Sequence, residues 1–384
     1  MSARPSTDAK PTWAVAVEDP QSVVARERGV PVCQCLEQLG YSVRLVEDGD
    51  PAGLQADVLL FLENLADFGR YRRLLARTTG RRPVTAVWMF ETLPPSSLTP
   101  EADRIGRAAA AWQQRLGLQI PKRHLSTWQK RLTLHGLRHW LYKQLSGVGF
   151  LRTLKLLQRV DPTLADTHWT QIRSSMVNWD CLQRTRLEGW LDHCIVSTQQ
   201  RQRFLEERGW SAPFVPVGCQ EKDGRLLSLA RDIDVLFLGY VRKDRRRDLL
   251  KTLETDLATR GLSLRVITGN CYGEERIQLL NRTRILVMLH QYRWSPAWIR
   301  FGFAAQCGAC VVSEPMADTQ PFQADIHYAS APAAQLPEVI ERLLRDDDER
   351  SRLVSAAAEL CRTSLTLHHS VRQIAEIVTR SMNR

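Results

Sequence analysis

The feature that most constrains this chain is an alternation of short apolar runs with longer segments whose apolar residues recur at helical spacing. The first runs fall at residues 13–17, 41–46, 57–62 and 84–90. Strands that are apolar along their whole length are typical of a parallel sheet covered by helices on both faces. The first 90 residues therefore predict a doubly wound α/β domain.

The alternation stops between Ala108 and Trp190, where the sequence is basic, rich in tryptophan and helical in pattern. It resumes with a strand-like run at 192–198, a helix over 199–208 and an extended segment at 213–217. The polar stretch at 218–231 then indicates a linker between domains.

A second series of strands and helices follows this linker. Strands are expected at 234–239, 262–267, 285–289 and 309–312, with a fifth at 325–328. Three helices are expected to close the chain, at about 334–345, 348–362 and 367–380. We predict two Rossmann-like doubly wound domains, 1–217 and 218–365, with a basic helical insertion at about 104–188 in the first. Ligands of such sheets bind beyond the carboxyl ends of the strands.

The charge of the chain is concentrated in one segment. The chain has 53 Lys and Arg against 42 Asp and Glu, yet residues 104–160 contain no acidic residue. Twelve basic residues lie there: Arg104, Arg107, Arg115, Lys122, Arg123, Lys130, Arg131, Arg138, Lys143, Arg152, Lys155 and Arg159. Leucines at helical spacing beside basic and tryptophan side chains suit an anionic membrane surface or acceptor. The equally favoured alternative is a helix that packs by its leucines and leaves its basic face in water, and nucleic-acid binding is the least favoured.

Other patterns narrow the class of protein. No apolar run is long enough to span a membrane, and residues 1–13 lack the apolar core of a signal peptide, which predicts a cytoplasmic protein, peripheral at most at the inner face of the membrane. Nine cysteines without a repeated CxxC indicate reduced thiols and no structural zinc. No P-loop or GxGxxG occurs. Asp232 and Asp234 form a DxD, but it precedes a strand, which is the wrong end for a ligand.

The first candidate site is the loop after the strand at 234–239. Gly239 allows close approach of a ligand to the backbone, and the following helix offers free N–H groups to an anion. Five basic residues surround that helix start: Arg242, Lys243, Arg245, Arg246 and Arg247. Cations there oppose the helix dipole, which favours a bound anion over the alternative of a solvated basic turn.

The second candidate site follows the strand at 285–289. His290 ends that strand, where it either meets a sugar hydroxyl or is satisfied by a backbone carbonyl. Ser295 and Pro296 predict the start of a helix, so Arg300 would lie in its first turns. The guanidinium of Arg300 suits bidentate contact with phosphate.

Several stretches together resemble the GT-B glycosyltransferases. Within that family, they resemble most the branch related to spore-maturation glycosyltransferases. They are 236–240 (LFLGY), 281–290 (NRTRILVMLH), 300–314 (RFGFAAQCGACVVSE) and 321–322 (PF), with 190–200 (WLDHCIVSTQQ) and 214–218 (FVPVG) in the first half. The resemblance covers about 189–384 well and 1–90 in architecture only. It implies that the last helix, 366–384, crosses back to brace the first domain.

The resemblance also implies a function. The chain would transfer a sugar from a nucleoside diphosphate sugar to an unidentified acceptor, with retention at the anomeric carbon and with neither a metal nor a cofactor. The residues that would bind the donor are Gly239, Arg242, Lys243, Arg245, His290, Arg300 and Glu314. Arg245 and Arg300 would stabilise the departing diphosphate, and Glu91, just after the fourth strand, is the candidate base on the acceptor side.

One position departs from the family pattern. Where such enzymes carry a Glu that holds the donor ribose, this chain has Phe303, which cannot accept hydrogen bonds from hydroxyls. Either Glu314 or another residue makes this contact, or the donor binds in a different pose, or activity is lost. The alternative function is a nucleotide-binding or membrane-associated scaffold that kept the GT-B fold without catalysis.

Overall fold

The computed structural model of the chain describes residues 10–23, 25–62, 65, 68–115, 155–161, 164, 169–241, 245–269, 271–291, 294 and 297–382. Its contacts divide the chain into two compact units. The smaller unit is Glu91–Glu188, and the larger unit combines Met1–Phe90 with Gly189–Arg384. The predicted boundary at 217 falls inside the larger unit, which contains both of the sheets.

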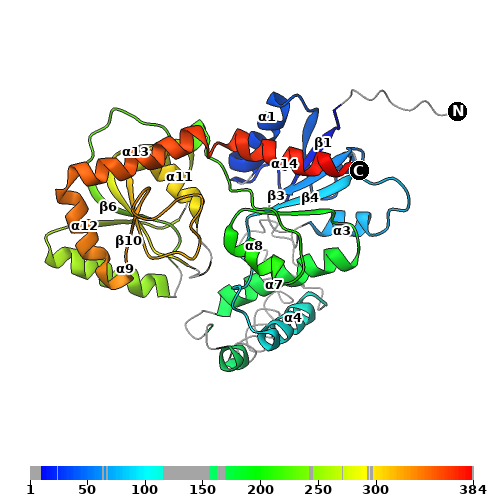
Figure 1. Cartoon of the computed structure of the whole chain (residues 1–384), viewed down its shortest axis with the longest axis horizontal. Helices are drawn as coiled ribbons and strands as arrows, with labels where there is room; N and C mark the ends of the chain where they lie inside the picture. The colour runs from blue at the N-terminus through cyan, green and yellow to red at the C-terminus, as the bar shows by residue number, and fades with distance from the viewer. Residues whose placement is uncertain are drawn as a thin grey trace, which may run out of the picture. The chain divides into compact units, whose positions relative to one another are not determined.

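The first sheet of the larger unit has five parallel strands in the order β2-β1-β3-β4-β5 (Figure 1). The strands are β1 (Trp13–Val17), β2 (Val43–Glu47), β3 (Val58–Leu62), β4 (Val84–Met89) and β5 (His193–Val196). The helices of this half are the π-helix η1 (Ala25–Gly29), α1 (Val30–Gln38), α2 (Pro51–Leu54), α3 (Gly69–Leu75) and α8 (Gln199–Glu206). The segment at 213–217 contributes a bridge between Phe214 and Val196 rather than a named strand.

The second sheet also has five parallel strands, in the order β10-β9-β8-β6-β7. The strands are β6 (Ile233–Leu238), β7 (Leu264–Ile267), β8 (Thr283–Met288), β9 (Cys310–Ser313) and β10 (Ala329–Ser330). The α-helices are α9 (Arg245–Thr259), α10 (Gly273–Asn281), α11 (Trp298–Gln306), α12 (Leu336–Arg345), α13 (Asp347–Thr363) and α14 (Leu367–Met382). Two short 3-10 helices, η4 (Glu221–Asp223) and η5 (Ala333–Gln335), complete this half.

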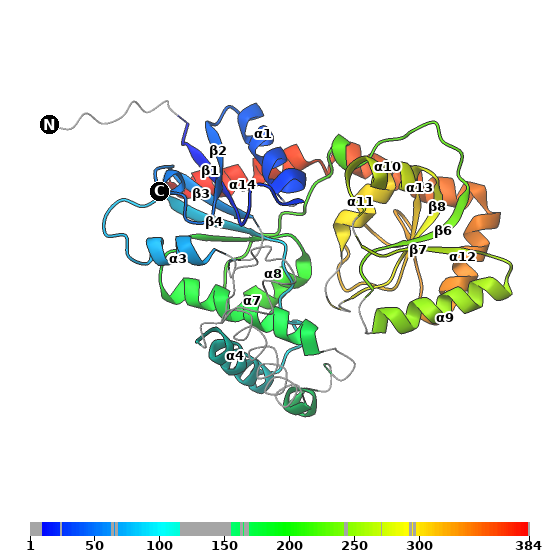
Figure 2. The same ribbon diagram turned by 180° about the vertical axis from the view of Figure 1, so that it is seen from behind.

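Both sheets share one topology, because each lies in the order second, first, third, fourth, fifth strand. The helices around the second sheet lie on opposite faces of it (Figures 1 and 2). Val235 and Phe237 of β6 pack with α9 and α12, whereas Leu236 and Leu238 belong to the core formed with α10, α11 and α13. The predicted pair of doubly wound α/β domains is therefore confirmed.

The fifth strand of the second sheet differs from the expectation. The prediction was 325–328, but the strand is β10 (Ala329–Ser330). Asp325 has a φ of 63°, and its N–H donates to the carbonyl oxygen of Tyr328 at 2.7 Å. A left-handed residue that closes a turn cannot continue a strand. The run at 325–328 is therefore the turn that precedes the strand.

Helix α14 packs against the first sheet although it follows the second in sequence. Leu367, Val371, Ile374 and Val378 recur at helical spacing and lie in one core with residues of β1, β3 and α1. The chain passes from one half to the other twice, and the two crossings touch. A Cβ at Gly218 would lie 2.2 Å from the backbone of Thr366, so only glycine allows this approach.

The smaller unit contains α4 (Pro100–Arg115) and α7 (Trp169–Leu187). Asp103 joins them, because its carboxylate accepts from Trp179 Nε1 at 2.8 Å and pairs with Arg107 at 3.0 Å. The unit starts at Glu91 rather than near 104, since Asn178 Nδ2 donates to Thr92 O at 2.9 Å and holds the segment before α4 in place. Residues 116–154, which carry most of the predicted basic face, lie outside the described residues.

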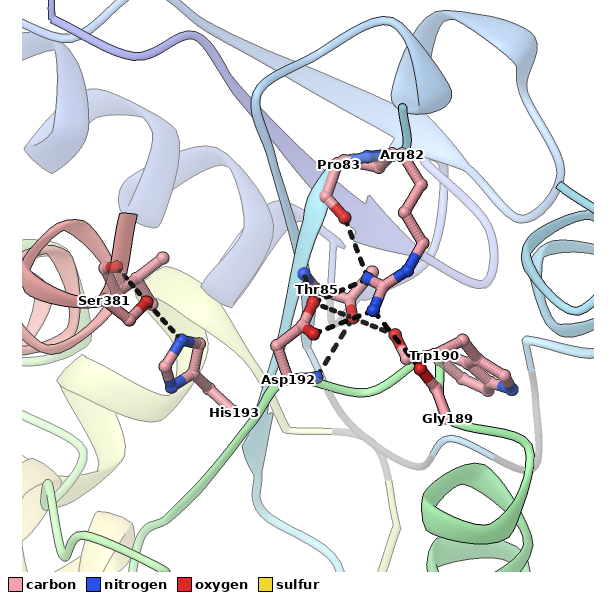
Figure 3. Close-up of polar contacts among 9 residues, drawn as sticks. Arg82, Pro83, Thr85, Gly189, Trp190, Asp192, His193 and Ser381 are labelled. Carbon is pink, nitrogen blue, oxygen red and sulfur yellow. Dashed lines mark hydrogen bonds and ion pairs between the residues drawn. The ribbon is translucent and has the colours of Figure 1, made fainter. Parts of the chain in front are cut away.

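A polar network joins the start of β4 to the start of β5, where the chain returns from the smaller unit (Figure 3). Arg82 binds both carboxylate oxygens of Asp192, at 2.6 and 2.8 Å, and also donates to Gly189 O. Asp192 Oδ2 accepts from Thr85 N at 2.8 Å. Burial raises the pKa of Asp192, but Arg82 and the Thr85 N–H lower it further, so the pKa lies below its usual value.

Three smaller features concern the cysteines, the start of α13 and the lengths of the helices. All nine cysteines are buried and none is in a disulfide, so they pack as small apolar side chains. Asp346 accepts from Glu349 N at 2.8 Å and caps α13. In the part of the chain that the structure describes, no helix is long and apolar enough to cross a membrane.

Candidate functional site

The candidate site lies at the carboxyl ends of β6 and β8, which are neighbours in the second sheet. The helix that follows β6 covers one face of this sheet, and the helix that follows β8 covers the other. The loops after these strands therefore diverge, which is the switch point where doubly wound sheets bind their ligands. Gly239 follows β6 and His290 follows β8, so the sequence placed two of its candidates there.

Arg300 lies against Gly239 at this edge. It is the third residue of α11, and a Cβ at position 239 would lie 2.5 Å from Nη1 of Arg300. Within the described residues, the Arg300 guanidinium has no ion-pair or hydrogen-bond partner. Burial lowers the pKa of Arg300, although arginine stays protonated at neutral pH. A cation that is half-buried without an anion indicates a place for an anionic ligand.

The start of α11 differs from the prediction. The helix begins at Trp298, with Ala297 in the cap position and no side-chain capping bond. Ser295 and Pro296 lie outside the described residues. Arg300 nevertheless occupies the first turn of the helix, as predicted.

Arg245 and Glu314 form a bidentate ion pair at the same edge. Arg245 is the first residue of α9, and Glu314 directly follows β9. Arg245 Nη1 donates to Glu314 Oε2 at 3.0 Å, and Nη2 donates to Oε1. Burial raises the pKa of Glu314, but Arg245 and the His290 N–H outweigh it, so the pKa is lowered and the carboxylate stays ionised. The sequence named both residues but not their pairing.

His290 is buried beside this pair. Its N–H donates to Glu314 Oε2 at 3.0 Å, and its Nε2 lies 3.1 Å from Glu314 O and 3.1 Å from Ser313 Oγ. Burial lowers the pKa of His290, so the imidazole is neutral at pH 7. The ring therefore contacts a backbone carbonyl, which is the second of the two interpretations offered for it.

The other basic residues of the loop after β6 have separate positions. Arg246 is buried and donates to Tyr240 O at 2.9 Å, whereas Arg247 pairs with Asp248 at 3.1 Å in solvent. Arg242 and Lys243 lie outside the described residues. The five cations predicted to act together thus include at least two with structural contacts of their own.

Three further carboxylates considered in the sequence are Glu91, Asp232 and Asp234. Glu91 is an exposed residue at the start of the smaller unit, and its assignment as a base stays a prediction. Asp232 pairs with Arg282 at 2.8 Å and Asp234 with Arg284 at 3.3 Å, at the amino end of β6. Both DxD carboxylates are thus in ion pairs away from the candidate site. Among the described residues, no group of three or more His, Cys, Asp or Glu could hold a metal ion.

Phe303 occupies the position where the resemblance implies a Glu. The ring is buried, and the guanidinium of Arg276 lies 3.7 Å from its centroid. Arg276 also pairs with Glu27 at 3.2 Å. Sequence reasoning missed Arg276, because nothing along the chain connects it to residue 27 or residue 303. The aromatic ring at 303 is thus covered by a cation of the chain itself.

The part of the chain that contains the second sheet resembles a known protein family. A family model described as "Glycosyl transferase-like" matches residues 243–376. Residues 243–376 are therefore similar to this family, and the match covers less than half of the chain. The matched range contains Arg245, His290, Arg300 and Glu314. No curated protein matches the chain in sequence.

Solved structures extend the likeness to both halves. HepE of Anabaena, solved with UDP and glucose, is 10% identical over 97% of this chain and 100% of HepE, with a TM-score of 0.53. TarM, known from S. aureus, is 8% identical over 90% of this chain and 58% of TarM, with a TM-score of 0.50. At such identities the likeness shows a shared fold. The predicted GT-B fold is therefore confirmed, and the spore-maturation branch stays a prediction.

Proposed function

We propose that the chain transfers a sugar from a nucleoside diphosphate sugar to an acceptor. The observation that carries the proposal is the position of Arg300, a half-buried cation without a partner in the described residues, at the switch point of a glycosyl transferase-like domain. HepE, which shares the fold, was solved in complex with UDP-glucose. A diphosphate at this edge would supply the negative charge that Arg300 lacks.

In the proposed reaction, the bond between the anomeric carbon and the diphosphate breaks while a bond to the acceptor oxygen forms. Negative charge then accumulates on the departing diphosphate, where fixed cations stabilise it most effectively. Arg300 would contact the departing diphosphate directly. Arg245 would also contact it, through guanidinium N–H groups that do not donate to Glu314. Two arginines at this place support a metal-independent reaction. The acceptor's proton needs a base, for which Glu91 is the proposed residue, and the resemblance favours retention.

The test is Arg300→Ala, compared with Arg282→Ala at the amino end of the same sheet. We expect Arg300→Ala to weaken binding of UDP by at least about tenfold, since a hydrogen bond to a charged group contributes about 1.5–3 kcal/mol. Titration calorimetry would measure the affinity, and circular dichroism would check the fold. Equal UDP affinity in wild type and Arg300→Ala would contradict the proposal, and Arg282→Ala should behave as wild type.

A second function, nucleotide binding without transfer, is favoured by Phe303. The aromatic ring under Arg276 cannot accept hydrogen bonds from ribose hydroxyls. Thermal shift with a panel of nucleoside diphosphates, followed by an assay for slow hydrolysis of the matching donor, separates the two functions. Stabilisation with hydrolysis supports the transferase, and stabilisation with no hydrolysis or transfer supports the scaffold.

The proposed contacts with the acceptor's surroundings come from the smaller unit. Lys155 and Arg159 are exposed while Leu157 is buried, which is the amphipathic arrangement predicted for this segment. We propose that residues 104–160 contact an anionic surface, such as a membrane, that presents the acceptor. Co-sedimentation with anionic vesicles at low and high salt tests this, and absence of binding at low salt would exclude it.

A further inference from the structure

The outer edge of the second sheet is open at β7 (Leu264–Ile267). Among the described residues, this strand is the last in the sheet order. Its four residues are half-buried or exposed, whereas the neighbouring strand β6 is buried along most of its length. Val266 has an exposed fraction of 37%. An open strand edge is a template for another strand unless something covers it.

The backbone groups of Val266 point away from the sheet. Gly239 N donates to Ile267 O at 3.0 Å, so the carbonyl group of Ile267 faces β6. Because consecutive residues of a strand direct their N–H and C=O groups to opposite sides, those of Val266 face outward. Val266 therefore offers one donor and one acceptor to a further strand.

A groove of about 530 Å³ lies beside this edge and is lined by residues of β7, of α10 and of the segment before β6. Leu229, Ile267 and Leu279 give the groove apolar walls, and Arg265 and Glu275 place one charge of each sign in it. In strand addition, backbone hydrogen bonds along an edge combine with side-chain contacts in such a groove. The surface fits a partner that supplies a strand, apolar side chains and both charges.

A second copy of this chain supplies all three. Arg265 and Glu275 line the same groove, so a twofold axis at the edge brings the Arg265 of each copy toward the Glu275 of the other. The axis pairs β7 with its copy in the antiparallel direction, and directly opposite side chains then lie on one face of the sheet. Two registers satisfy this rule, with either Arg265 or Val266 opposite its own copy. Like charges directly opposite each other are destabilising, so the register is the one that pairs Val266 with Val266.

We propose that the chain forms a symmetric dimer through β7, with the two strands antiparallel and Val266 opposite its own copy. The two Val266 residues exchange N–H···O hydrogen bonds, and their exposed side chains cover each other. Arg265 lies opposite Ile267 of the other copy and reaches the groove that contains Glu275 of that copy. The second sheets of the two chains then form one continuous sheet. The proposal does not depend on the proposed transfer of a sugar.

Analytical ultracentrifugation tests the dimer. We expect the wild type to have twice the mass of one chain at about 100 μM. Val266→Lys places two like charges opposite each other and should raise the dissociation constant of the dimer by at least about tenfold. Val30→Lys is the matched control, because Val30 of α1 is 38% exposed, and it should assemble as the wild type does. Circular dichroism checks the fold of each variant.

Cysteine variants test the register, since all nine native cysteines are buried. Val266→Cys should form a disulfide-linked dimer on mild oxidation, because the Cα atoms of a directly opposite pair lie about 5.5 Å apart, within the range of a disulfide. Arg265→Cys should not, because its copy is offset by two residues along the partner strand, which separates the Cα atoms by more than about 7 Å.

A wild type that stays a monomer at about 100 μM would overturn the dimer. So would Val266→Lys if it dimerised as strongly as the wild type. Failure of Val266→Cys to cross-link, with or without cross-linking of Arg265→Cys, would overturn the register. Each of these results leaves the proposed function standing, because UDP binding is measured separately.

Discussion

The two sheets have the same strand order, but the arginines at their carboxyl ends have different surroundings. In the first sheet, Arg201 lies beyond β4 and β5 and donates to Phe90 O at 2.6 Å and to Ser197 Oγ at 2.9 Å. In the second sheet, Arg300 lies against Gly239 with no such partner among the described residues. The first arginine satisfies acceptors of its own chain, whereas the second has donors to offer a ligand. One topology thus serves structure in one half and, in our proposal, ligand binding in the other.

The largest effect is expected at the ion pair of the second sheet. Arg245→Ala leaves the buried Glu314 carboxylate without its cation, and we expect it to lower the free energy of unfolding by about 3 kcal/mol. The double variant Arg245→Met with Glu314→Gln should recover most of this loss, since no buried charge remains. Urea denaturation of wild type, Arg245→Ala and the double variant measures both changes. A double variant as unstable as Arg245→Ala would show that packing, rather than charge, holds this edge.

The contrast between the two arginines is the next test. Arg201→Ala should lower the free energy of unfolding by about 2 kcal/mol, because it removes charged hydrogen bonds to buried oxygen atoms. Arg300→Ala should leave stability unchanged or slightly raised, because it removes a half-buried cation that has no partner in the described chain. Guanidinium denaturation provides both values. A large loss of stability in Arg300→Ala would contradict the expected difference between the two arginines.

A smaller effect is expected at the amino ends of the strands, where both sheets carry ion pairs. Asp192→Asn should lower the free energy of unfolding by about 1.5 kcal/mol, since the carboxylate holds Arg82 and Thr85 N in the network of Figure 3. The exposed Asp232, changed to Asn, should produce no measurable loss. Because the pKa of Asp192 is lowered, its contribution is present above about pH 4 and is lost as the pH falls further. Thermal melts at pH 7 and pH 3.5 test both statements.

The smallest effect concerns His290, whose pKa is lowered by burial despite the nearby Glu314, with Arg245 and Arg246 also lowering it. The unfolded chain binds a proton below about pH 6.5 that the folded chain does not, so stability falls as the pH drops below that value. We expect a loss of about 1 kcal/mol between pH 7.5 and pH 5.5 in wild type. His290→Gln should remove this pH dependence in denaturant titrations. An unchanged slope would assign the titration to another group.

Much of the fold could be predicted because its signals are local. Apolar runs such as those in β3 and β6 identify buried strands. The run at 325–328 misled the prediction, because Asp325 adopts a left-handed conformation there, which the apolar pattern does not reveal. At the candidate site, residue types placed Gly239 and Arg300 at strand ends, but the pairing of Arg245 with Glu314 had no local signal.

The sequence by itself determined the class of the fold, the ends of the strands and therefore the edge where a ligand can bind, because apolar periodicity and turn chemistry act over a few residues. Only the tertiary structure decided which cations remain available there. Arg245 pairs with a carboxylate 69 positions away, and Arg300 lies against a glycine. The physical reason is that charge compensation depends on distance in space, and the order of strands in the sheet sets that distance.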